Sequence, residues 1–267
     1  MRRVLAFAFA LLLLPALAGA QSGTKKKRPL PPEYGRVLIG TPYSEQKFPD
    51  AQFDHWLHRA KFTCRVCHVD VGFAMKSNGT GIRKDDIMAG FYCGACHNGK
   101  TPHEGRTVFA ACSETFTEEE RQTRCLRCHS GGQKGRQQYD FFAFVKDLPK
   151  ERFGNGIGWQ EAEETGKIKP SDYVEGLSFK RRALEIPKDI DIEAKVPGMN
   201  EIIFSHKKHT FWSGCEGCHP EIFSGIKQGM TKFSMMENFE GKYCGQCHAT
   251  VAFPMIDCQR CHSKPVQ

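Results

Sequence analysis

The chain lacks long hydrophobic runs beyond its first twenty residues, and it is poor in aliphatic side chains. Hydrophobic residues make up 40% of its 267 residues, a figure that includes 13 cysteines and an apolar N-terminal stretch. Without these, roughly a third of the residues are apolar, below the ~45–50% (glycine included) of typical globular domains. This composition disfavours an enzyme with an ordinary aliphatic core. It predicts that cross-links or a cofactor complete the core.

The first twenty residues have the features of a secretory signal peptide. Arg2 and Arg3 precede the apolar run Val4–Leu14, and Ala18-Gly19-Ala20 offers a small-residue cleavage site. The run is too short to span a bilayer, no later run is longer, and no cysteine near the cleavage site can carry a lipid. We therefore expect residues 1–20 to be removed and the protein to be exported. The periplasm is the first expectation, with the outer surface or the extracellular space as alternatives.

Twelve of the 13 cysteines fall in six copies of one motif, Cys-x-x-Cys-His, which attaches c-type haem. In this motif the two thiols add to the vinyl groups of a porphyrin, and the adjacent histidine binds the iron. Disulfide frameworks and zinc sites do not require a histidine after every second cysteine. The sequence therefore predicts six covalent haems. The attaching cysteines are Cys64, Cys67, Cys93, Cys96, Cys125, Cys128, Cys215, Cys218, Cys244, Cys247, Cys258 and Cys261. The proximal iron ligands are His68, His97, His129, His219, His248 and His262.

Four of the five remaining histidines form a repeated phrase. His55 and His58 follow Phe53 and precede a haem motif, and His206 and His209 stand 151 positions later in the same arrangement. The same offset relates the first two haem motifs of each half, so a three-haem unit is duplicated. Histidines at i and i+3 project from one helix face and reach two neighbouring irons. A surface or packing role suits an isolated pair, but the repetition beside irons that need sixth ligands favours ligation.

This phrase, with Gly-Lys-Tyr-Cys-Gly-x-Cys-His at the second haem motif, resembles the c7-type triheme cytochrome domain, a relative of the class III multihaem cytochromes c. The resemblance covers residues 51–132 and 199–267. It implies a mostly α-helical or irregular fold with few or no strands, in which the haems form the core of two triheme modules. It also implies four axial pairs: His55 with His68, His58 with His97, His206 with His219, and His209 with His248.

The third haem of each unit lacks an evident sixth ligand. In the first unit we assign His103 to the haem of His129, with Met75 or Met88 as the alternatives if His103 is only a loop residue. In the second unit no histidine is left for the haem of His262. There Met236 is preferred, and the alternatives are Met230, Met235, Met255, an open iron or a ligand from another subunit. A methionine ligand would raise the potential of this haem above the others.

The rest of the chain carries no second chemical signature. Residues 21–50 form a basic, proline-containing tail, and residues 133–198 connect the two units, with short helices expected at 140–144 and 159–164. Cys112 is a spare thiol that we expect to be buried, with a free reactive thiol or an intermolecular disulfide as alternatives.

These observations predict an electron carrier rather than an enzyme. The resemblance suggests an anaerobic respiratory or extracellular electron-transfer chain, with unidentified redox proteins as partners, no nucleic acid and a possible homo-oligomer. A reductase of a small oxyanion at one open haem is the first rival, although no motif has lysine in place of its histidine. A subunit of a polymeric cytochrome wire is the second. The net charge of +8 is offset by the propionates of six haems, so it does not by itself predict an acidic partner.

Overall fold

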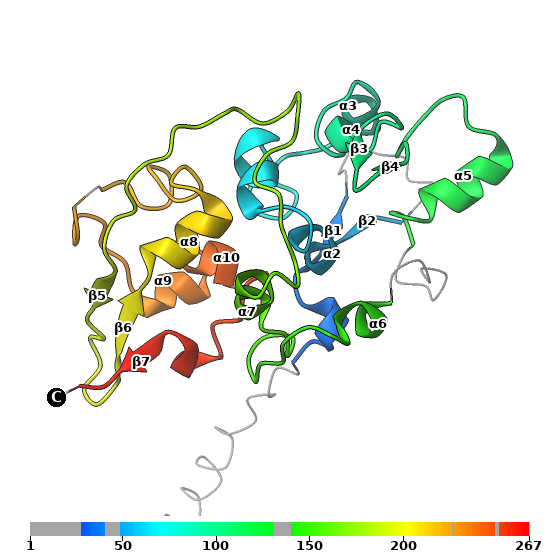
Figure 1. Cartoon of the computed structure of the whole chain (residues 1–267). Coiled ribbons are helices and arrows are strands. Elements are labelled where there is room, and N and C mark those ends of the chain that lie inside the picture. The colour runs from blue at the N-terminus through cyan, green and yellow to red at the C-terminus, as the bar shows by residue number, and fades with distance from the viewer. Residues whose placement is uncertain (1–27, 41–48, 131–139, 226, 249–250, 267) are drawn as a thin grey trace, which may run out of the picture.

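The computed structural model describes residues 28–40, 49–130, 140–225, 227–248 and 251–266. Short helices and strands alternate with long irregular segments, and the two halves of the chain lie side by side (Figure 1). The mostly helical and irregular fold expected from the sequence is confirmed. The expected signal peptide lies outside the described residues. Among the helices in the described ranges, none is long and apolar enough to cross a membrane.

Three small antiparallel sheets hold the histidine-bearing segments in place. Strand β1 (Arg36–Ile39) pairs with β2 (Ala51–Asp54), and β3 (Pro102–His103) pairs with β4 (Arg106–Thr107). In the second half, β5 (Ile190–Ile192), β6 (Glu201–Phe204) and β7 (His262–Lys264) form one sheet in that order. Strand β2 ends directly before His55, and β6 ends two residues before His206, the first histidine of each repeated pair. They therefore fix where each histidine helix begins.

The helices are short, and most carry or flank haem motifs. The first half contains α2 (His55–Arg59), α3 (Lys84–Met88), α4 (Cys93–Cys96) and α5 (Glu118–Cys125), together with the π-helical turn η3 (Val66–Asp70). The connecting segment contains α6 (Phe141–Val145) and α7 (Trp159–Glu164), which confirms the two short helices expected there. The second half contains α8 (His206–Ser213), α9 (Met235–Phe239), α10 (Gly245–His248) and the 3-10 turn η4 (Cys258–Arg260). A further 3-10 turn, η2, covers Pro31–Glu33.

The duplication is visible in the backbone as well as in the motifs. Helix α9 begins and ends 151 positions after α3, and Tyr92 and Tyr243 share an unusual positive φ of 50° and 46°. A Cβ on Gly94 would lie 1.9 Å from the carbonyl oxygen of Ile87, and one on Gly245 would lie 1.9 Å from that of Asn238. Only glycine permits this close approach of the haem-motif helix to the preceding helix. The second haem motif of both units is therefore seated by the same contact.

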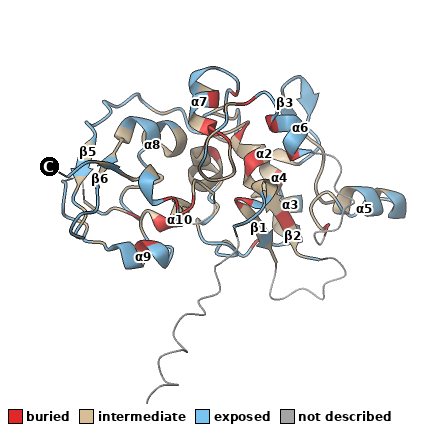
Figure 2. Ribbon diagram, turned by 90° about the horizontal axis from the view of Figure 1, so that it is seen from below, coloured by how far each residue is buried: buried red, intermediate tan, exposed pale blue. Residues whose placement is uncertain are grey.

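A conventional hydrophobic core exists, but it belongs largely to the connecting segment. Figure 2 shows buried residues gathered around α2, α6 and α7, while α5 and much of α8 face solvent. Trp56 of α2 packs edge-on against Phe141 of α6, and Trp159 and Ala162 of α7 join the same cluster. Helix α8 has lysines at the positions that match Trp56 and Leu57, so the equivalent face of α8 is polar and is not packed against apolar helices of the connecting segment. The connecting segment thus packs on the first unit through an apolar helix face that the second unit lacks.

Within residues 21–50, where we expected a tail, the part that the structure describes contains a strand and an ion pair to the second unit. Residues 36–39 form β1, and Arg28 makes a 2.7 Å ion pair with the buried carboxylate of Asp257 near the last haem motif. The physical reason is pairing: β1 satisfies the edge of β2, the strand that leads into His55. Its four residues are too few to show a strand pattern against a basic, proline-containing background.

Candidate haem sites

A single continuous cavity of about 3400 Å³ runs through both halves of the molecule. It is lined by every motif cysteine except Cys125 and by every histidine except His129. A site for one small molecule usually measures ~300–1,000 Å³. The size of this cavity and its cysteine and histidine lining therefore suit several large prosthetic groups rather than one ligand.

Three of the predicted histidine pairs face each other across this cavity. The ring centroids are 6.4 Å apart for His55 and His68, 6.3 Å for His58 and His97, and 6.1 Å for His209 and His248. Imidazole nitrogens bind metals at about 2.0–2.1 Å, so two rings on opposite sides of one metal have centroids about 6 Å apart. The observed spacings match that arrangement. The rings of the fourth pair, His206 and His219, line the same cavity but are not in contact.

Hydrogen bonds to backbone carbonyls orient most of these rings. The Nδ1 atom of His55 lies 2.5 Å from the carbonyl oxygen of Gly35, and that of His68 lies 2.9 Å from the oxygen of Phe73. When Nδ1 carries the proton and donates it in this way, Nε2 is left with a lone pair for a metal. The same contact is made by His206 to Lys188, His209 to Ser205, His219 to Phe223 and His248 to Phe253.

The proximal histidines of the two third motifs are held by matching contacts. His129 lies 2.6 Å through Nδ1 from the carbonyl oxygen of Pro49, and His262 lies 2.7 Å from that of Asn200. Pro49 and Asn200 are 151 positions apart, although the gaps that precede the third motifs differ in length. In each unit, the proximal histidine of the third motif is therefore held by a residue just before the strand that leads to the histidine pair, β2 or β6.

Burial favours the neutral form of several of these histidines. It lowers the pKa of His58 to about 3, with a further contribution from His97, and it lowers the pKa values of His55 and His248 to about 4. The backbone carbonyl of Asp54 opposes this shift in His58, although its geometry falls short of a hydrogen bond. A neutral imidazole is the form that binds iron.

The motif thiols form a spatial series. Burial, and then neighbouring thiols that include Cys96, raises the pKa of Cys67 to about 12. Burial and then Cys128 do the same for Cys93, which also reaches about 12. These couplings place the second motif of the first unit between the first and third motifs.

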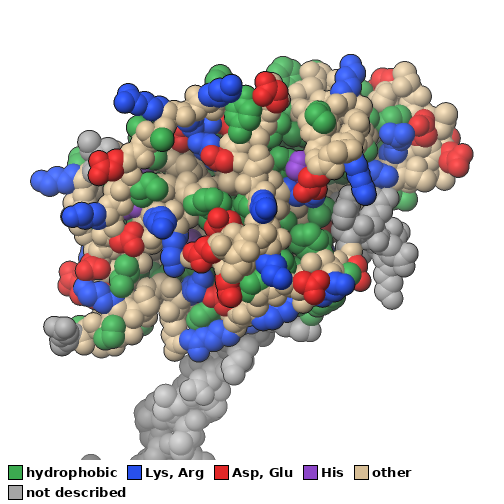
Figure 3. Space-filling view, viewed as in Figure 1, with side chains coloured by type: hydrophobic (Ala, Val, Ile, Leu, Met, Phe, Trp, Pro, Cys, Tyr) green, Lys and Arg blue, Asp and Glu red, His purple; other side chains and the backbone are tan. Residues whose placement is uncertain are grey.

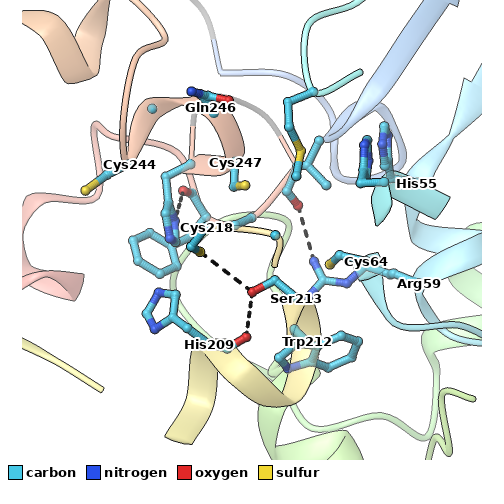
Figure 4. Close-up of a pocket in the computed structure, with 18 of the residues that line it drawn as sticks. His55, Arg59, Cys64, His209, Trp212, Ser213, Cys218, Cys244, Gln246 and Cys247 are labelled. Carbon is cyan, nitrogen blue, oxygen red and sulfur yellow. Dashed lines mark hydrogen bonds between the residues drawn. The ribbon is translucent and has the colours of Figure 1, made fainter. Parts of the chain in front are cut away.

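The series continues across the junction of the two halves. Burial raises the pKa of Cys247 to about 12, and the next contributions come from Cys64 and Cys218. Burial followed by Cys261 raises that of Cys244 to about 11. Figure 4 shows Cys64, Cys218, Cys244 and Cys247 around one part of the cavity. The first motif of one half therefore adjoins the first and second motifs of the other.

The family model described as "Cytochrome c7 and related cytochrome c" matches residues 51–130 and 202–263, which is more than half of the chain. The chain belongs to the cytochrome c7 family. Its two matched segments are duplicated c7 domains, and it is a multihaem c-type cytochrome with an electron-transfer role.

Two solved structures illustrate what this cytochrome is similar to. A "c7-type three-heme cytochrome domain" is 36% identical over 28% of this cytochrome and 93% of that chain, with a TM-score of 0.26. The C-terminal hexaheme fragment of GSU1996 is 21% identical over 89% of this cytochrome and 99% of that chain, with a TM-score of 0.25. These TM-scores are too low for an argument from superposition. No curated protein sequence matches this cytochrome.

His103, the residue assigned to the third haem of the first unit, packs on Phe62 with ring centroids 4.8 Å apart. Its Nε2 atom is buried, makes no hydrogen bond and lies 3.6 Å from the carboxylate of Glu104. The ring lines the cavity of this cytochrome, whereas His129 lies outside the lining. The structure thus leaves His103 with an available nitrogen, but it does not show the two histidines facing each other.

The preference for Met236 in the second unit does not fit the structure. Met236 is 67% exposed and Met230 is 62% exposed, and neither lines the cavity. Met235 and Met255 do line it. Met235 is the first residue of α9, and the ~100° rotation per helical residue turns the next side chain toward solvent. Sequence alone could not distinguish two adjacent methionines, because the start of the helix decides that Met235, which is 38% exposed, lines the cavity and Met236 does not.

Proposed function

We propose that this cytochrome carries six covalently bound haems and passes electrons along them outside the cytoplasm, in an anaerobic respiratory or extracellular electron-transfer chain. The observation that carries the proposal is the set of three histidine pairs spaced for one iron each, within a cavity lined by eleven of the twelve motif cysteines. Bis-histidine haems have no free coordination position, so they exchange electrons more readily than they bind substrates. We also propose that residues 1–20 are removed on export.

The proposed axial ligands follow the repeat. His55 and His68, His58 and His97, and His209 and His248 share irons through the spacings described above. His206 and His219 share a fourth iron, because they occupy the positions equivalent to His55 and His68 and line the same cavity. The haem supplies the one-electron chemistry, while the protein orients most of the histidine rings through contacts between Nδ1 and backbone carbonyl oxygens.

For the last haem we propose Met235 as the sixth ligand. The equivalent of Met235 in the first unit is Lys84, which lies near the third haem motif of that unit. Burial raises the pKa of Cys125 in this motif, and the nearby cations Arg121 and Lys84 lower it. By the repeat, Met235 lies in the same relation to the motif of Cys258. The Lys84 ammonium is paired with Glu114 at 2.5 Å, so His103 remains the proposed sixth ligand of the first unit's third haem.

We propose that electrons pass along the haems in the spatial order of their motif cysteines. Within each unit this order runs from the third motif through the second to the first, and the two first motifs meet at the junction. The two third haems therefore stand at opposite ends of the chain. Cys125 and Cys258 belong to these end motifs, and Cys258 is exposed, which suits contact with redox partner proteins.

Two measurements on the purified, haem-loaded protein test the proposal. Intact-mass spectrometry should show six haems on a chain that begins after residue 20. Electron paramagnetic resonance of the ferric protein should show low-spin haem only. Fewer than six haems would overturn the count. A high-spin signal that changes on addition of cyanide would overturn the carrier assignment in favour of a reductase with an open iron.

A further inference from the structure

A buried arginine lies at the junction between the two triheme units. Arg59 ends α2, and its guanidinium carbon lies 5.0 Å from the ring centroid of Trp159 and 5.2 Å from that of Trp212. Its Nη1 donates a 3.2 Å hydrogen bond to the carbonyl oxygen of Val251 (Figure 4). These contacts join one residue of the first unit to the connecting segment and to two parts of the second unit.

The charge of Arg59 has no acidic partner among the described residues. Its Nε atom is buried without a hydrogen bond, and no carboxylate of the described chain forms an ion pair with it. Burial lowers the pKa of Arg59, but a guanidinium stays protonated in proteins. Within the described protein, the contacts of this cation are therefore the two tryptophan rings and one backbone carbonyl oxygen.

Haem-binding residues surround this cation. Arg59, Cys64, His55 and His248 all line the cavity. Figure 4 shows Arg59 beside Cys64, on the side of the cavity that the two units share. The positive charge thus lies close to the haem that Cys64 and Cys67 would hold.

The second unit has no such charge at the matching place. The position 151 residues later is Thr210, a neutral side chain that donates a 2.7 Å hydrogen bond to the carbonyl oxygen of His206. The second haem motif and the glycine contact that seats it repeat closely between the units, but this position does not. Near the matching motif of the second unit, Arg65 is paired with Asp172 and Arg181 with Glu216. Among the described residues, the first unit's site alone therefore has beside it a buried cation without a carboxylate partner.

We propose that Arg59 tunes the redox chain: its buried charge raises the reduction potential of the haem at Cys64 and Cys67 above that of the matching haem at Cys215 and Cys218. The inference rests on the proposed six-haem function. Reduction adds one electron to the iron and removes one positive charge, so a nearby cation stabilises the reduced state. Low dielectric in the interior strengthens this effect. Between the first haems of the two units, an electron is thereby held preferentially on the haem at Cys64 and Cys67.

The test compares Arg59→Met and Arg59→Lys in the full haem-loaded protein. Resolved haem-methyl signals in NMR, followed through stepwise reduction, give the order in which the haems are reduced. Arg59→Met should lower the potential of the Cys64–Cys67 haem so that the matching haem is reduced at the same potential or first. Arg59→Lys keeps the charge and should preserve the wild-type order.

A matched control removes a cation that is already paired. Arg124 lies over the ring of Phe116, 4.9 Å from its centroid, and also pairs with Glu120, so Arg124→Met should leave the junction haem unchanged. An unchanged reduction order in Arg59→Met would overturn the proposal and leave Arg59 a purely structural link. If Arg59→Met fails to retain all haems, Arg59→Gln serves as the neutral variant with the same expected shift. Haem counting on the wild-type protein separates failure of this inference from failure of the six-haem proposal.

Discussion

At the scale of the residue, the sequence identifies the histidines but not the atoms that hold them. The repeated i, i+3 pairs could be found because helical geometry relates spacing to direction. The carbonyl groups that fix their tautomers could not, because Gly35 and Lys188 are 20 and 18 positions away from their histidines in unpatterned sequence. The orientation of each ligand ring therefore depends on neighbouring strands and turns rather than on its own motif.

The methionine of the last haem site gives a prediction at this scale. Met235→Leu should abolish the near-infrared band of Met–iron ligation and lower the potential of that haem, because the thioether ligand that raises it is lost. Met236→Leu is the matched control, since its side chain is exposed, and it should leave both properties unchanged. Near-infrared absorption of the ferric protein and a potentiometric titration measure the two effects. A band that survives in Met235→Leu and disappears in a Met255 variant would assign the ligand to Met255 instead.

At the scale of the element, the duplication predicted from motif spacing extends to contacts that no motif reveals. Helices α3 and α9 lie under the second haem motif of each unit, and a single glycine in the motif allows the approach. The strand β1 was missed for the opposite reason, since its pairing with β2 is a tertiary contact and its own residues carry little signal. The duplication can thus be predicted from the sequence, whereas the strands and helices that pack against each repeat cannot.

This contact predicts a strong effect of one added methyl group. Gly245→Ala places a Cβ against the carbonyl oxygen of Asn238, so α10 must shift away from α9. We expect a loss of at least ~1–3 kcal/mol in unfolding free energy and incomplete loading of the haem on Cys244 and Cys247. Thermal unfolding and haem counting measure these outcomes. Gln246→Ala, in the same motif without such a contact, should behave like the wild type, and equal stability of both variants would contradict the role of the glycine.

At the scale of the whole molecule, charged side chains of the connecting segment tie the two units together. Arg181 bridges the fully buried carboxylate of Asp70, two residues after His68, and Glu216, inside a haem motif of the second unit. Arg65 of the first unit pairs with Asp172 of the connecting segment. On the outer face, by contrast, basic and acidic side chains are interspersed without a patch of one sign (Figure 3). Arg65 and Arg181 thus connect the first unit, the connecting segment and the second unit.

Removing Arg181 should loosen that junction. In Arg181→Met the buried Asp70 carboxylate loses its partner. Removing one partner of a buried ion pair lowers the free energy of unfolding by on the order of 3–5 kcal/mol. We expect faster proteolytic cleavage of the connecting segment and a lower thermal midpoint, with all haems retained. Lys242→Met, which breaks an exposed pair with Glu240, is the control and should change neither measurement by much. Identical cleavage rates for the two variants would show that the bridge does not hold the units together.

The cavity has a consequence for how the protein is made. Folded interiors tolerate few voids larger than a water molecule, and this polypeptide would have to surround about 3400 Å³ without its prosthetic groups. We therefore expect haem attachment and folding to occur together, as in small domains that fold only when metal is bound. The amount of mature protein in a cell is then limited by the supply of haem and iron as much as by synthesis of the polypeptide.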